Sequence, residues 1–173
     1  MLNTNSRQRI LLPVKVWFIW LSLVFALLLN LLPPARVVGY PDFVALGLTF
    51  WCVHEPRRVN IGTAWVFGFA MDIADATLLG QHALCYGVLA YFASSLSRRL
   101  QWFPSTQQAM HMLPLMLGTQ LLMLGTNYVA GGMIPGWGFF LTSFTSALLW
   151  PVVSFLLMLP QRQPENVDET RPI

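Results

Sequence analysis

Six long apolar stretches follow one another along the chain, separated by short polar turns or by glycine and proline. They cover residues 13–32, 38–54, 61–79, 81–97, 109–130 and 137–159. A membrane core about 30 Å thick is crossed by about twenty helical residues, and these stretches approach or exceed that length. The pattern predicts an all-α integral membrane protein with six transmembrane helices in one compact bundle.

The residues between the stretches support this division. Pro33 and Pro34 end the first stretch, and Pro104 separates the fourth from the fifth. Pro41 and Asp42 suit the first turn of the second helix, where proline fits and a negative charge meets the positive helix end. We expect one membrane domain over residues 1–160. The polar segment 161–173 is predicted to be a disordered cytoplasmic tail.

The basic residues predict how the helices are oriented. Nine of the ten lie before or at the start of the first stretch, after the sixth or in alternate connections, and these are Arg7, Arg9, Lys15, Arg57, Arg58, Arg98, Arg99, Arg162 and Arg171. Cytoplasmic loops retain Lys and Arg, so both termini are predicted to be cytoplasmic, with Arg36 alone outside. Arg57, Arg58, Arg98 and Arg99 are then expected to meet lipid headgroups.

Composition excludes several other classes of protein. The chain is 55% hydrophobic and only 10% charged, whereas a soluble domain is about 25% charged. The net charge of +3 is spread over short turns rather than gathered in a basic, aromatic patch, so no nucleic-acid binding is expected. Cys52 and Cys85 lie inside apolar stretches without metal-ligand spacing. We expect no metal and no cofactor.

Two acids inside the third stretch are its most unusual feature. Asp72 and Asp75 are three residues apart, so both project from one helical face, which Gly68 shares. An intramembrane acid is costly and should face protein or water. Three roles are open. The first is structural, with the acids either bonded to Gln120, Asn127 or hydroxyls of the sixth helix or in water at the outer edge; the second is contact with a partner; the third is proton, metal or catalytic chemistry. Because paired catalytic acids of membrane proteases lie on different helices, no enzymatic activity is expected.

Small and polar residues inside the other stretches are candidates for helix packing or for a partner-binding face, because small side chains let helices approach in lipid. These candidates are Gly68, Ala83, Gly87, Ala90, Ser94, Gln120, Asn127, Thr142, Ser146 and Pro151. Pro151 is expected to kink the sixth helix. An alternative is a cavity between the third, fifth and sixth helices, lined by Asp72, Asn127 and Thr142, in a small-molecule capture or transport subunit.

Several local motifs resemble one protein family. Residues 56–84 contain Arg58-Val59-Asn60, the Gly68 and Asp72 pair, and Leu79-Gly80 followed by Ala83-Leu84. Weaker matches are Pro41-Asp42-Phe43, Pro135-Gly136-Trp137 and Leu148-Leu149-Trp150-Pro151. Together they run from about residue 13 to 160 and resemble the rod shape-determining protein MreD family. Asp72 matches the family pattern better than Asp75.

The resemblance implies a role in bacterial cell elongation without catalysis. It implies binding to MreC, a single-span protein with a periplasmic domain, and indirect connection to MreB filaments, a RodA-type glycosyltransferase and a class B penicillin-binding protein. A face formed by the third to sixth helices is then expected to receive the MreC helix. The family's six-helix arrangement is similar to the substrate-capture subunits of energy-coupling-factor transporters, which implies a fold and no ligand.

Overall fold

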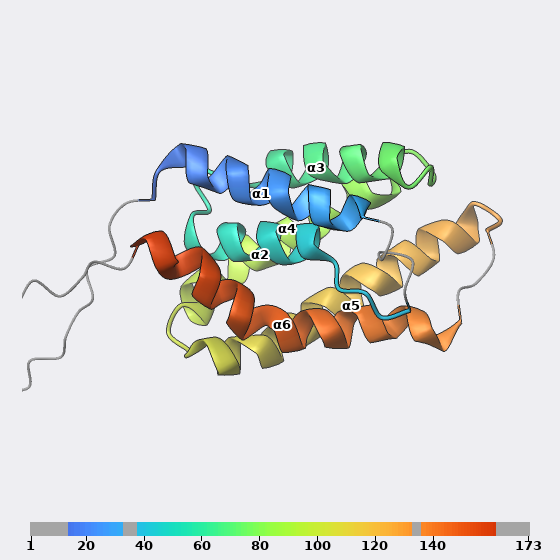
Figure 1. Ribbon diagram of the computed structural model, residues 1–173. Helices are drawn as coiled ribbons and strands as arrows, with labels where there is room; N and C mark the ends of the chain where they lie inside the picture. Colours follow the sequence, from blue (N-terminus) through green and yellow to red (C-terminus); the bar gives the residue numbers. More distant parts are fainter. Residues whose placement is uncertain (1–13, 33–37, 133–135, 162–173) are drawn as a thin grey trace, which may run out of the picture.

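The computed structural model describes residues 14–32, 38–132 and 136–161, and all regular structure in these ranges is helical (Figure 1). The six α-helices are α1 (Val16–Leu31), α2 (Phe43–His54), α3 (Ile61–Ala74), α4 (Gln81–Leu100), α5 (Ser105–Val129) and α6 (Leu141–Met158). Short 3-10 helices η2 (Trp137–Phe140) and η3 (Leu159–Gln161) flank α6. The prediction of an all-helical chain is confirmed.

Two of the helical segments are long and apolar enough to cross a membrane. They are Ser105–Val129 and Trp137–Gln161, while Val16–Leu31, Phe43–His54 and Ile61–Ala74 are shorter apolar helices. Large hydrophobic side chains remain exposed on every helix except α2, among them Phe25, Val66, Tyr91 and Leu148. Water-soluble monomers rarely expose apolar surface so widely, and a lipid environment accommodates it.

The third helix is shorter than the sequence pattern predicted. It ends at Ala74 rather than at residue 79, and residues 75–80 form a turn. Ala76 and Gly80 take positive φ angles of 50° and 94°, which no right-handed helix can contain. Gln161, the first residue of the predicted tail, is instead buried and belongs to η3. Residues 162–173 lie outside the described part of the chain.

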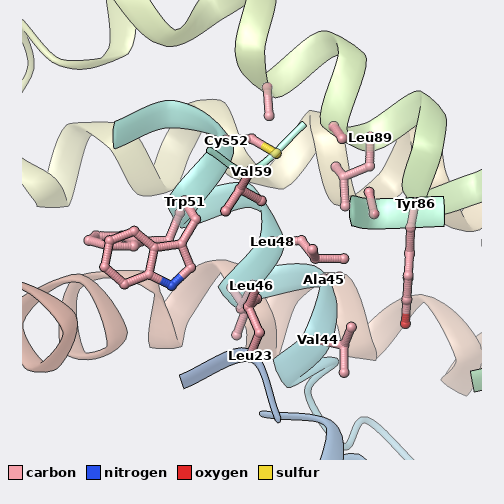
Figure 2. Packing of buried hydrophobic residues seen from close by; sticks show 14 of the residues in the cluster. Leu23, Val44, Ala45, Leu46, Leu48, Trp51, Cys52, Val59, Tyr86 and Leu89 are labelled. Carbon is pink, nitrogen blue, oxygen red and sulfur yellow. The ribbon is translucent and has the colours of Figure 1, made fainter. Parts of the chain in front are cut away.

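Helix α2 occupies the centre of the bundle. Its residues from Val44 to Val53 are all buried, because the helix has no polar face to direct toward the surface. It contacts α1, α4 and α6, and α3 packs along α4 on the other side of α4 from α5 (Figure 1). Figure 2 shows part of the core that results, in which Leu46 of α2 lies beside Leu23 of α1.

Charge is divided between the two ends of the bundle. The described basic residues lie at one end, at the start of α1, after α2 and at the end of α4, and these are Lys15, Arg57, Arg58, Arg98 and Arg99. Three acids, Asp42, Asp72 and Asp75, lie at the other end, at the start of α2 and the end of α3. We call these the basic end and the acidic end.

Candidate functional site

The carboxylate of Asp72 caps the N-terminus of α4. It is 1% exposed and accepts hydrogen bonds from the backbone N–H groups of Gly80 at 2.8 Å, His82 at 2.7 Å and Ala83 at 3.4 Å. The first N–H groups of a helix have no partner within the helix, and the helix dipole favours a negative charge there. Asp72 therefore fastens the end of α3 to the start of α4.

Two side chains complete the surroundings of this carboxylate. His82 Nδ1 lies 2.9 Å from Asp72 Oδ1, and the Thr77 hydroxyl donates to the same oxygen at 3.3 Å. One of the alternatives left open by the sequence placed the partners of Asp72 on the fifth and sixth helices. Its observed partners lie instead in the turn after Ala74 and at the start of α4, because that turn brings the first residues of α4 back over the Asp72 side chain.

Asp75 differs from Asp72 although the two were predicted to share a face. It is the C-cap residue of α3, and its side chain is 45% exposed. Asp75 Oδ2 is 4.0 Å from His82 Nε2, beyond hydrogen-bond length. The pair thus consists of one buried structural acid and one acid at the rim of the bundle.

Gly68 lies where the backbones of α3 and α4 come closest. A Cβ atom on Gly68 would lie 2.5 Å from Ala83 Cα and 2.6 Å from Ala83 N, so no side chain fits. Ala83 itself is fully buried. The absence of a side chain at residue 68 lets the start of α4 approach Asp72.

Asp42 is a second anchoring acid, and the sequence predicted only its position at the start of a helix. Its carboxylate accepts from Ala45 N at 2.9 Å, Asn30 Nδ2 at 2.9 Å and the Tyr86 hydroxyl at 2.7 Å. Its own N–H donates to Ser146 Oγ at 3.2 Å. One residue therefore joins α1, α2, α4 and α6, and no short-range signal in the sequence could have shown these partners.

Glutamine side chains join the remaining helices. Gln120 on α5 donates from Nε2 to Phe139 O at 2.9 Å and accepts from the Ser143 hydroxyl at 2.5 Å. Gln81 donates from Nε2 to Met123 O at 3.1 Å, which ties α4 to α5. In an apolar medium such polar bonds between helices are a main source of specific packing.

A cavity of about 280 Å³ lies at the acidic end, among the side chains that form these hydrogen bonds between helices. Of the three residues that the sequence predicted to line a cavity, only Thr142 does so, while Asp72 and Asn127 are not among its lining residues. Asp42, Asp75, His82 and Gln120 contribute to the lining instead. Among the described residues, no group of three His, Cys, Asp or Glu side chains is placed to hold a metal ion.

The small residues of α4 pack inside the chain. Ala83, Gly87 and Ala90 are all buried, and a Cβ atom at Gly87 would touch only Ile61 of α3, at 3.7 Å. Ser94 is half-buried, and its hydroxyl donates to Tyr91 O of the same helix. Ala83, Gly87 and Ala90 therefore pack within the chain, as the first of the two predicted roles requires, because α3 and the rest of the bundle cover them.

The other predicted residues occupy varied positions. Ser146 is buried beside Asp42, Asn127 is half-buried, and α6 continues through Pro151. At the basic end Arg58 donates to Val14 O at 2.5 Å and lies 3.7 Å from Glu55, while Arg57, Arg98 and Arg99 are exposed. Cys52 and Cys85 are buried free thiols.

These features define an all-helical protein with an apolar outer surface, held together at one end by buried polar ties. The sequence model of the family described as rod shape-determining protein MreD matches residues 12–159. The rod shape-determining protein MreD of Haemophilus influenzae is 31% identical over 151 residues, which cover 82% of this chain and 89% of that protein. The chain belongs to the MreD family of rod shape-determining proteins, as the sequence motifs predicted. No solved structure matches the chain.

Proposed function

We propose that the chain is a non-enzymatic, multi-pass protein of the inner membrane that assembles the rod-shape machinery. Its direct partner is MreC, and through MreC it connects MreB filaments to a RodA-type glycosyltransferase and a class B penicillin-binding protein. Membership in the MreD family supports the role in rod shape. The side chains of Asp72, Asp42 and Gln120 form their hydrogen bonds within the chain. The surface that a partner could contact is therefore mostly apolar.

The observation that favours one partner surface is the uncovered face of α5. Pro114, Gly118, Leu121, Gly125 and Tyr128 are all exposed and follow one another at spacings of four and three. Nothing lies within 4 Å of a Cβ atom built on Gly118 or Gly125. A face with two glycines seven residues apart allows a second helix to approach closely in lipid. We assign this α5 face to the MreC transmembrane helix.

Depletion and complementation test the role in cell shape. Rods depleted of their own MreD are expected to become round, and this chain supplied in trans is expected to restore rods. Microscopy of cell width and length gives the result. Rods that stay unchanged on depletion, or round cells that this chain does not restore at normal protein level, would contradict the proposed role.

Recovery of MreC tests the α5 face. Gly118→Leu and Gly125→Leu are expected to reduce the amount of MreC that co-purifies, because each leucine fills the space that the partner helix needs. Ser95→Leu is the matched control, since Ser95 is an exposed small residue of α4 whose hydroxyl bonds only within its own helix. Equal recovery from all three variants at equal protein level would exclude α5 as the face.

A further inference from the structure

A groove between α1 and α6 lies on the outside of the bundle and takes no part in the polar network described above. Its volume is about 390 Å³, and it is lined by Phe18, Leu21, Ser22, Val24, Phe25, Leu28, Leu156 and Leu157. Helix α2 contacts both α1 and α6 and lies between them (Figure 1). The Trp51 ring of α2 packs edge-on against Phe18 of the groove.

The described residues that line the groove offer no free polar group to an occupant. Ser22 is its one polar lining residue, and the Ser22 hydroxyl donates to Ile19 O at 2.8 Å while accepting from Trp51 Nε1 at 2.8 Å. The remaining lining side chains are Phe, Leu and Val. An occupant must therefore be apolar along the whole groove, since a polar group there would lose its hydrogen bonds to water without replacement.

The lining also favours a flexible chain over a second helix. Helices that pack in lipid meet through Gly, Ala, Ser and Thr, and Ser22, which is already engaged, is the one such residue in the lining. Along α1 the groove runs from Phe18 to Leu28, about 15 Å at 1.5 Å per helical residue. That length is half of a hydrocarbon core about 30 Å thick, so it matches one leaflet.

Positive charge stands at one end of the groove. Lys15 is the N-cap residue of α1, three residues before Phe18, and so lies at the end of the helix where the groove begins. Lys15 is exposed, and no described acid lies within ion-pair distance of it. Arg58 donates to the backbone carbonyl of Val14, the residue before Lys15, and also lies 3.7 Å from Glu55.

We propose that the α1–α6 groove binds one anionic phospholipid, with an acyl chain along Phe18 to Leu28 and the headgroup at Lys15 and Arg58. The inference rests on the membrane placement given under Proposed function. The basic end is the predicted cytoplasmic side, and the cytoplasmic leaflet carries the anionic lipids. The proposed site thus combines an apolar groove with cationic side chains at the basic end of the bundle.

Native mass spectrometry of the full chain tests the proposal. Protein reconstituted in vesicles of equal phosphatidylglycerol and phosphatidylcholine, then released into mild detergent, is expected to keep one phosphatidylglycerol molecule. Lys15→Gln should reduce the bound fraction about fivefold, which corresponds to about 1 kcal/mol for one cation near an anionic surface. Arg98→Gln is the matched control, because Arg98 is exposed at the same end on α4, and it should leave retention unchanged.

A groove-filling variant tests the acyl chain separately. Val24→Trp should exclude phosphatidylglycerol and phosphatidylcholine alike, whereas Val66→Trp, at an exposed position of α3, should not. Equal retention by all four variants, equal retention of the two lipids, or capture of an MreC helix in the groove by cross-linking would overturn the proposal. Reporter fusions separate the two proposals. If they show that α1 does not cross the membrane, the proposed membrane topology fails together with the lipid site. If they show that α1 does cross, equal retention of the two lipids contradicts the lipid site and leaves the topology standing.

Discussion

At the residue scale, two acids at the same end of the bundle do similar structural work. Asp72 and Asp42 each cap the first turn of a following helix, and each also binds side chains from other segments. A carboxylate can accept several hydrogen bonds at once, which suits it to a point where several helices meet. The buried charge is thereby satisfied by the chain itself.

Replacing Asp72 tests this role. Asp72→Ala should lower the free energy of unfolding by about 3 kcal/mol, because the N–H groups of Gly80 and His82 would be left buried without an acceptor. Asp72→Asn should cost less, since one amide oxygen remains. Thermal unfolding of the purified protein in detergent measures both.

The neighbouring acid is the control for this prediction. Asp75→Ala should change the free energy of unfolding by less than about 0.5 kcal/mol, as expected for an exposed side chain. The same order, with Asp72 more sensitive than Asp75, is expected for cell shape. If Asp75→Ala were as damaging as Asp72→Ala, the rim acid would have a role beyond its contacts within the chain.

At the element scale, the packing of α3 on α4 depends on contact between backbones. Gly68 and Ala83 bring the two helices together at the end where Asp72 caps α4. The hydrogen bonds from the start of α4 to Asp72 and the close contact between Gly68 and Ala83 therefore depend on each other. A wider separation of α3 and α4 would lengthen the hydrogen bonds to Asp72. The turn at residues 75–80 provides the short connection.

Adding a methyl group at Gly68 should separate these helices. Gly68→Ala is expected to destabilise the protein by about 2 kcal/mol, because its Cβ atom would overlap the Ala83 backbone. Gly125→Ala should be neutral or stabilising by up to about 1 kcal/mol, since alanine favours a helix and the space there is open. Thermal unfolding of the two variants, side by side, separates packing from helix propensity. A stabilising Gly68→Ala would contradict the close crossing.

At the scale of the whole molecule, the bundle has an acidic end and a basic end with an apolar surface between them. The basic end carries Arg57, Arg58, Arg98 and Arg99, and the acidic end carries the polar ties and the cavity. This polarity corresponds to the positive-inside arrangement of a membrane protein. With the basic end cytoplasmic, as proposed, the cavity would lie on the outer side and the α1–α6 groove on the inner side.

Reporter fusions test the proposed six-span topology. Fusions after Arg57, Gln101 and Ile173 should report the cytoplasmic side, and fusions after Leu79 and Gly131 the outer side. The positive-inside rule and the helix order require this alternation. Alkaline phosphatase and β-galactosidase activities measure it. If only α5 and α6 crossed the membrane, the sites after Arg57, Leu79 and Gln101 would all report one side.

The sequence alone determined the features that depend on local pattern. Apolar periodicity predicted six helices, proline and glycine predicted most of their ends, and short motifs around Arg58 and Asp72 predicted the family. Each of these signals lies within a few residues or within one helix, so it can be read without knowing what packs against it. The cost of an intramembrane acid also predicted that Asp72 would face protein or water, and its carboxylate is buried within the chain.

Only the tertiary structure decided what the polar residues contact. The partners of Asp42 lie 12, 44 and 104 residues away, and Gln120 bonds to residues of η2 and α6. Nothing local distinguishes the buried Gly68 and Gly87 from the exposed Gly118 and Gly125, because their burial depends on which helix lies alongside. Helix formation is a short-range property of the chain, whereas the choice of neighbours is made by packing among all six helices, and it determines which faces remain for partners and lipid.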